Sequence, residues 1–233
     1  MSRKIGLAGA RARSFCVLVT LACATYQPAA GGEETATKID LGKGEIGAGL
    51  NEFDLPPSTA GRRGSWTLVR DASAGTGVAI EHAGMPMSED QFSLAIYNPA
   101  SLRNAEVSVR LNAAGGKSEQ GGGIAIRLSS PQNYYLVQLD ALRDRVLLSL
   151  VDNGASKEIV DVDADVASGS WHTLAVRAKD NEFIVSLDGI WMFTAFDKTF
   201  SQPGRIALWS KGDSVTRFDS ITITPLPASE QKY

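Results

Sequence analysis

Two runs decide the fold of this chain: GSWHTLAV at residues 169–176 and FIVSLDG at residues 183–189. Apolar residues stand at alternate positions in both runs, which is the period of a strand with one buried face. Asp180-Asn181 lies between the runs, and Asp188-Gly189 supplies the positive φ of a type I′ hairpin turn. The sequence therefore predicts consecutive antiparallel strands here, and the side chains predicted to point inward are Leu174, Val176, Phe183, Val185 and Leu187.

The same alternation continues on both sides of this region, with turn signals such as Asn153-Gly154 roughly every 8–12 residues. Further strands are predicted at 66–69, 77–81, 92–97, 105–111, 124–129, 134–140, 145–152, 157–162, 191–196, 205–210 and 216–223. We predict an all-β fold, an antiparallel β-sandwich of the jelly-roll type, as a single domain over residues 38–226. A domain of this size buries a substantial core and does not require disulfides.

The N-terminus has the pattern of an export signal over residues 1–24. A basic start precedes the apolar run Ser14–Ala24, which is too short to span a bilayer, and Ala22-Cys23-Ala24 matches a cleavage site. The alternatives are a cut after Ala30, a short membrane anchor, or a lipoprotein cut before Cys23. Residues 25–37 are predicted to be a flexible lead-in. We expect an exported protein, periplasmic or secreted, with no membrane span in the mature chain.

The composition of the chain argues against several kinds of partner and site. The formal net charge is −3 and no basic stripe exists, so a nucleic-acid partner is not expected. Both cysteines lie in the predicted signal, which leaves the mature chain without a thiol for catalysis or metal binding. His82 and His172, the only histidines, do not have the spacing of a zinc site.

The decisive runs also resemble a known superfamily. Together with Gly123–Arg127, Asn133–Tyr135, Gly204–Trp209 and Phe218-Asp219, they are similar to the concanavalin A-like lectin/glucanase sandwiches, including laminin G-like modules. The resemblance covers roughly residues 60–224 and points to the bacterial exported branch, often grouped with the 3-keto-disaccharide hydrolase domain. It implies the sandwich fold. It leaves function open, because the superfamily includes lectins, glycosidases, lyases and adhesion modules.

The run DVDAD places Asp161, Asp163 and Asp165 at alternate positions. In an extended strand, adjacent members are about 6.7 Å apart, which is compatible with an inverting glycosidase pair. No aromatic residue flanks the run to stack on a sugar ring. A solvated loop or strand end is favoured over a calcium-binding patch and over a catalytic site.

A second candidate set is predicted to point outward. If Tyr135 and its alternate neighbours face the core, Tyr134 and Gln138 face out, and Arg127 is expected beside them on the adjacent strand. Trp209 is expected to face outward next to Lys211. Arginine, amide and aromatic groups on a concave face are the groups with which proteins bind sugars, and the alternative is a solvated face with structural ion pairs.

Three remaining residues are given structural roles. Trp171 and Trp191 are predicted to pack in the core or at its edge, and His172 to be a hydrogen-bonded strand histidine, because no Ser or Cys partner for catalysis is evident.

The sequence favours an exported, non-catalytic carbohydrate-binding or interaction module. The ligand-binding candidates are Arg127, Tyr134, Gln138, Trp209 and Lys211, no residue is assigned as catalytic, and no cofactor is expected apart from a possible calcium ion. The alternatives are a glycosyl hydrolase or lyase acting on a modified disaccharide, and an adhesion or scaffold module without a sugar ligand. The oligomeric state stays open.

Overall fold

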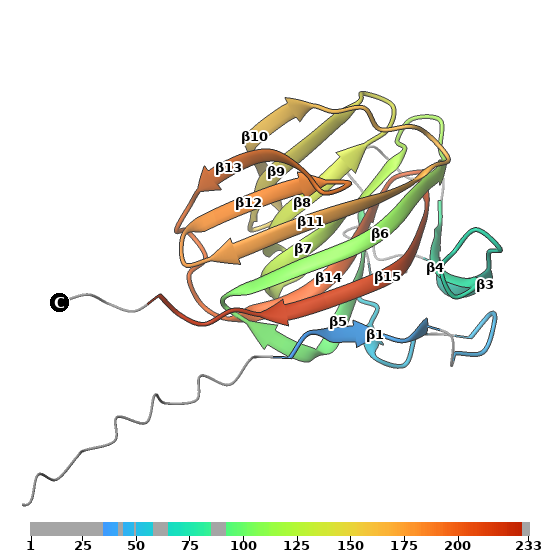
Figure 1. Ribbon diagram of the computed structural model, residues 1–233, viewed down its shortest axis with the longest axis horizontal. Coiled ribbons are helices and arrows are strands. Elements are labelled where there is room, and N and C mark those ends of the chain that lie inside the picture. Colours follow the sequence, from blue (N-terminus) through green and yellow to red (C-terminus); the bar gives the residue numbers. More distant parts are fainter. Residues whose placement is uncertain (1–34, 42–43, 49, 58–64, 85–91, 230–233) are drawn as a thin grey trace, which may run out of the picture. The chain divides into compact units, whose positions relative to one another are not determined.

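The computed structural model describes residues 35–41, 44–48, 50–57, 65–84 and 92–229 (Figure 1). The chain separates into two units, residues 1–33 and 34–233. The predicted signal peptide and most of the predicted lead-in lie outside the described residues. No helix in the described part is long and apolar enough to cross a membrane.

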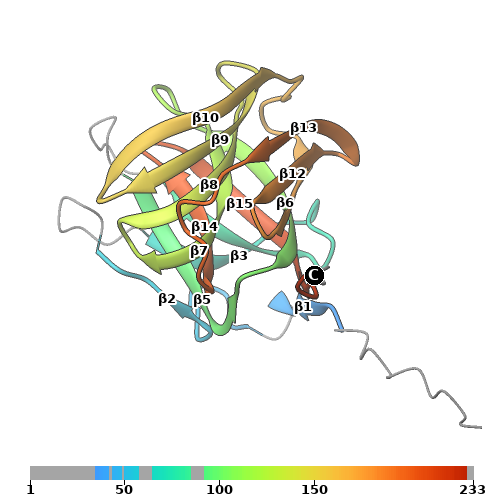
Figure 2. The same cartoon turned by 90° about the vertical axis from the view of Figure 1, so that its left-hand side faces the viewer.

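Two antiparallel sheets form a sandwich (Figures 1 and 2), which confirms the predicted fold class. The order of the first is β13-β12-β11-β6-β15-β4-β3, with β1 also paired to β15, and that of the second is β10-β9-β8-β7-β14-β5-β2. The eight-stranded sheet consists of β1 (Thr37–Ile39), β3 (Ser65–Arg70), β4 (Val78–Ala83), β6 (Ala105–Gly115), β11 (Trp171–Lys179), β12 (Glu182–Leu187), β13 (Ile190–Phe196) and β15 (Val215–Pro225). The seven-stranded sheet consists of β2 (Phe53–Asp54), β5 (Phe92–Leu102), β7 (Gly121–Ser130), β8 (Asn133–Asp140), β9 (Arg145–Asp152), β10 (Ala155–Asp163) and β14 (Gly204–Lys211).

Residues 169–189 form the two antiparallel strands that their alternating apolar pattern predicts. β11 pairs with β12, and β12 with β13, through turns in which Asp180 and Asp188 have φ near +53° and +52°. The inward side chains of β11 and β12 are buried in the main core between the sheets. Alternation with one apolar face thus gave the correct hairpins and the correct buried face.

A second apolar cluster lies on the other face of the seven-stranded sheet. Along β8, Tyr135 and Val137 belong to the main core, whereas Tyr134 and Leu136 belong to this second cluster. Its members are Leu94, Ile96, Ala125, Leu128, Tyr134, Leu136, Val151, Ala207 and Trp209, with Phe92 packed against them. We call this side of the sheet the outer face. It is apolar at its centre.

The predicted position of Arg127 is wrong. Arg127 is only 2% exposed, has φ +49°, and sits where the pairing of β7 shifts register against both β8 and β14. A bulge adds a residue and changes which face the following side chains occupy, so Leu128 joins the outer cluster. Gly204 makes room for the bulge, because a Cβ there would lie 2.3 Å from the Arg127 carbonyl carbon.

The guanidinium of Arg127 is turned away from Tyr134 and Gln138 and binds backbone instead. It donates to the carbonyls of Arg103 (2.9 Å), Phe200 (3.1 Å) and Asp180 (2.6 Å). Its central carbon lies 5.1 Å from the centre of the Phe183 ring. Arg127 therefore ties three loops at one end of the sandwich together and is not available to a ligand.

His82 on β4 is expected to make stability depend on pH. It is 1% exposed, its ring lies 4.9 Å from that of Trp66, and Nδ1 lies 3.2 Å from the Ser214 carbonyl oxygen. Burial lowers its pKa below the ordinary value of 6.5, so the folded state holds it neutral while the unfolded chain takes up a proton. The resulting stability is present above pH 6.5 and is lost as the pH falls toward the folded pKa.

Urea unfolding between pH 7.5 and 5 measures this effect. We expect the free energy of unfolding to fall by up to about 1.4 kcal/mol per pH unit below pH 6.5. In His82→Phe this slope should disappear. An equal slope in the variant would show that His82 is not its source.

Candidate functional site

Strand register brings three of the predicted ligand-binding residues together on the outer face. Trp209 on β14 lies opposite Gly123 on β7, and Gly123 lies opposite Gln138 on β8, so the three form a row across the sheet. Lys211 and Asp140 stand two residues further along their strands and on the same face. The sequence predicted that Tyr134, Gln138, Trp209 and Lys211 point outward; the register shows that they share one face.

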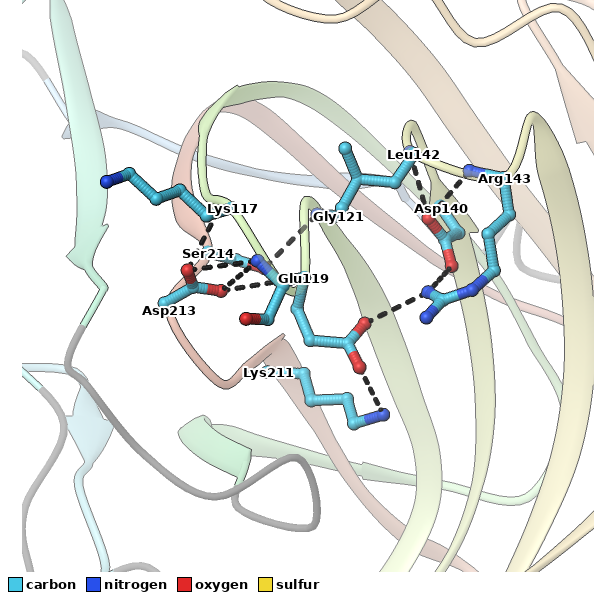
Figure 3. Close-up of polar contacts among 10 residues, drawn as sticks. Lys117, Glu119, Gly121, Asp140, Leu142, Arg143, Lys211, Asp213 and Ser214 are labelled. Carbon is cyan, nitrogen blue, oxygen red and sulfur yellow. Dashed lines mark hydrogen bonds and ion pairs between the residues drawn. The ribbon is translucent and has the colours of Figure 1, made fainter.

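An ion-pair cluster closes this end of the outer face (Figure 3). Glu119 precedes β7 and lies between two cations, with Oε1 2.8 Å from Lys211 Nζ and Oε2 3.3 Å from Arg143 Nη1. The same Arg143 nitrogen donates to Asp140 Oδ2 at 2.6 Å. The four side chains carry two positive and two negative charges. We call them the four-charge cluster.

A second carboxylate fixes the backbone that carries Glu119. Asp213 accepts hydrogen bonds from the backbone N–H groups of Lys117 (2.8 Å), Ser118 (3.1 Å) and Glu119 (2.8 Å), as Figure 3 shows. Burial, the largest single effect, raises the pKa of Asp213, but these backbone bonds together outweigh it and leave the pKa below its ordinary value. Asp213 is thus an ionised anchor for residues 117–119.

The cations of the cluster are accessible and its anions are not. The side chains of Arg143 and Lys211 are 52% and 33% exposed, whereas that of Glu119 is 10% exposed. The hollow between Glu119, Gln138, Trp209 and Lys211 has a volume of about 10 Å³, enough for about one water molecule. A ligand larger than a water molecule would therefore lie over this hollow, where it would meet N–H donors held in place by buried carboxylates.

The aromatic side chains of this face are more deeply buried than predicted. Trp209 is 6% exposed and Tyr134 is not exposed. The ring of Phe92 lies 6.5 Å from that of Trp209 and 6.1 Å from that of Tyr134. Burial also raises the pKa of the Tyr134 phenol, which stays neutral. The outward direction was right, but Trp209 is not an exposed sugar platform, because its ring packs in one apolar cluster with Tyr134, Ala125 and Phe92.

The acidic run DVDAD is partly a strand, and its first member is not solvated. Asp161 lies on β10, its side chain is 8% exposed, and Oδ2 pairs with Arg145 at 2.5 Å. Its other oxygen, Oδ1, is buried without a hydrogen-bond partner among the described residues. Asp163 ends the strand and is exposed. No group of three or more acidic, His or Cys side chains in the described part of the chain is arranged to hold a metal ion.

Trp171 points away from the core, which corrects its predicted role. It is half-buried on the outside of the eight-stranded sheet, where its indole N–H donates to Ser73 Oγ at 2.8 Å. Arg110 lies 4.6 Å from its ring centre. His172 is the hydrogen-bonded strand histidine that was predicted, with Nδ1 2.7 Å from Asp188 Oδ2. It stabilises the turn that begins at Asp188.

Sequence reasoning missed Glu119, Arg143 and Asp213. Glu119 lies in a glycine-rich connection without periodicity, and its anchor Asp213 is 94 residues away. Arg143 was visible only as part of the turn after β8. One usable signal existed: Lys211 and Asp213 follow Trp209 at alternate positions, and so mark the end of an outward-facing row.

Comparisons with known proteins agree with this architecture. No protein-family model and no curated protein sequence matches the chain. Among solved structures, the carbohydrate binding module CBM66 from Bacillus subtilis has a TM-score of 0.57 at 21% identity, covering 73% of this chain and 97% of that one. A Bacillus subtilis protein of unknown function with a galectin-like fold has a TM-score of 0.53 at 8% identity, covering 76% and 91%. The chain therefore has the concanavalin A-like sandwich fold.

Proposed function

We propose that this protein is an exported, non-catalytic carbohydrate-binding module, and that the four-charge cluster with Gln138 is its glycan site. The observation that carries the proposal is the pair of accessible cations, Lys211 and Arg143, held by the buried Glu119 carboxylate. Donors fixed before the ligand arrives lose little conformational entropy on binding. The similarity to CBM66 supports a sugar ligand at the level of the fold. Export rests on the basic and apolar N-terminal sequence alone.

The charge balance favours a neutral glycan. Lys211 and Arg143 are offset by Glu119 and Asp140, and Arg145 is offset by Asp161. An anionic ligand would have to compete with carboxylates that already occupy the cations. Sugar hydroxyls donate and accept at once, so they can bridge the remaining N–H donors and the Gln138 amide without displacing an ion pair.

The enzymatic alternative, hydrolysis or lyase cleavage of a modified disaccharide, has less support. A glycosidase needs a carboxylic acid with a raised pKa and a second carboxylate within about 5–9.5 Å of it. Glu119, Asp140 and Asp161 are each paired with a basic side chain. All three carboxylates are thus engaged in ion pairs within the protein.

A glycan array followed by calorimetry tests the proposal. We expect binding to neutral glycans, and a loss of at least about tenfold in affinity, roughly 1.4 kcal/mol, for Arg143→Ala and for Lys211→Ala. Arg177→Ala is the matched control, since Arg177 lies on the eight-stranded sheet in a loose pair with Glu106 at 4.0 Å. Equal losses in all three variants would contradict the site.

Turnover is measured on the same glycans and on 3-keto-disaccharides. The proposal predicts none. Cleavage that is abolished by Glu119→Gln would replace it with the enzymatic alternative.

A further inference from the structure

The edge strand β13 exposes an unusual amount of apolar surface. Ile190, Trp191 and Phe196 are 68%, 64% and 65% exposed. Three of the five large hydrophobic side chains that are exposed in the described part of the chain thus lie on this one seven-residue strand. Trp191 was predicted to pack in the core or at its edge. It instead points outward, with its indole N–H donating to Thr194 Oγ1 at 3.2 Å.

β13 also has little of the usual protection of an edge. It pairs with β12 on one side; no described strand pairs with its other side, and β10 of the other sheet lies nearby. Edge strands are normally protected by a charged residue or a proline, and the sequence IWMFTAF contains neither. A register shift opposite Val185 and Ser186 is its one irregularity. Such a strand is suited to pair with another strand.

We propose that β13 is a self-association surface, on which a second copy of this chain adds its own β13 in the antiparallel direction. The charges at the two ends of the strand favour this partner. Asp188 lies in the turn before β13, with its side chain 45% exposed, and Lys198 is exposed just after it. Antiparallel pairing of two identical strands places each Lys198 beside the partner's Asp188. Because the strand itself is uncharged, no like charges meet at its centre.

The apolar area that β13 can bury sets the expected affinity of the dimer. An aromatic side chain buries about 150–250 Å² in all, so the exposed parts of Trp191 and Phe196 provide roughly 100–150 Å² each. The four rings of a dimer then contribute about 400–600 Å², and Ile190 with the strand backbone brings the total toward the lower range of specific interfaces. We expect a reversible dimer with a dissociation constant of about micromolar order.

Sedimentation equilibrium over about 1–500 μM tests this, with the range set by the expected micromolar constant. The native protein should change from monomer to dimer within it. Trp191→Lys and Phe196→Lys should each raise the dissociation constant at least tenfold, and Lys198→Glu should raise it by a smaller factor that depends on salt. Leu142→Lys is the matched control, since Leu142 is 44% exposed in the turn between β8 and β9.

A monomer at every concentration would overturn the proposal, and so would dissociation by Leu142→Lys as strong as that by Trp191→Lys. Unchanged thermal unfolding of the dilute variants shows that they fold. If the native protein is monomeric and Trp191→Lys lowers glycan affinity instead, the strand is a sugar platform and the self-association proposal is wrong.

Discussion

Replacing Arg127 by Met is expected to lower the free energy of unfolding by about 3–5 kcal/mol, the largest effect on stability that we predict for a single side chain. Met keeps most of the length and apolar volume but cannot donate to the carbonyls of Arg103, Phe200 and Asp180. Each acceptor that loses its partner out of contact with water costs about 1–3 kcal/mol. Urea unfolding at pH 7.5 measures the change.

Two further variants test whether the hydrogen bonds of Arg127, and not its positive charge, stabilise the fold. Arg127→Lys keeps the charge but has one nitrogen where the guanidinium reaches three carbonyls, so we expect it to be destabilised nearly as much. Arg177→Met removes an arginine from an exposed pair and should cost less than about 1 kcal/mol. A native-like midpoint for Arg127→Met would show that water satisfies the three carbonyls and that the bulge is held by other contacts.

The largest expected effect on binding is that of Asp213→Ala. The change removes the acceptor of three backbone N–H groups, so residues 117–119 lose their anchor and Glu119 no longer holds Lys211 and Arg143 in place. We expect glycan affinity to fall by more than tenfold, beyond the loss in either cation variant, and thermal unfolding to occur at a lower temperature. Asp152→Ala, exposed at the end of β9 on the seven-stranded sheet, is the control that should change neither.

The same carboxylate predicts a pH dependence. Because the folded pKa of Asp213 is lowered, its contribution to stability is complete above the ordinary value of 3.8 and is lost as the pH falls below it. The difference in stability between native protein and Asp213→Ala should therefore narrow below about pH 4. A difference that stays constant down to pH 2.5 would mean that the carboxylate charge does not anchor the loop.

How far the sequence could lead is best seen on the seven-stranded sheet. Simple alternation correctly pointed Tyr134, Gln138, Trp209 and Lys211 outward, because no irregularity interrupts β8 after Tyr134 or β14 after Ile206. Alternation gave the wrong face for Arg127, because the bulge there shifts the register of β7 without changing the order of apolar and polar residues in the sequence. The needed clue, a glycine at position 204, lies on a neighbouring strand that only the fold identifies.

The site itself depends on contacts that no local pattern encodes. Asp213 holds the backbone of Glu119, and the Glu119 carboxylate pairs with Lys211 on β14 and with Arg143 in the turn after β8. The depth of Trp209 also escaped prediction, because apolar residues occur on both faces of β14 and alternation cannot say how closely rings pack over small neighbours. The face of the sheet to which a side chain points follows from the local sequence, whereas the exposure of that side chain depends on its neighbours across the whole sheet.

One measurement tests the central claim most directly: amide chemical-shift mapping by NMR as the protein is titrated with the neutral glycan that the array selects. The account predicts the largest shifts at Gly121, Gln138, Arg143 and Lys211, around the four-charge cluster, with little change on the eight-stranded sheet. Shifts confined to β13, or to the surface around Trp171, would contradict it and move the glycan to the other side of the sandwich.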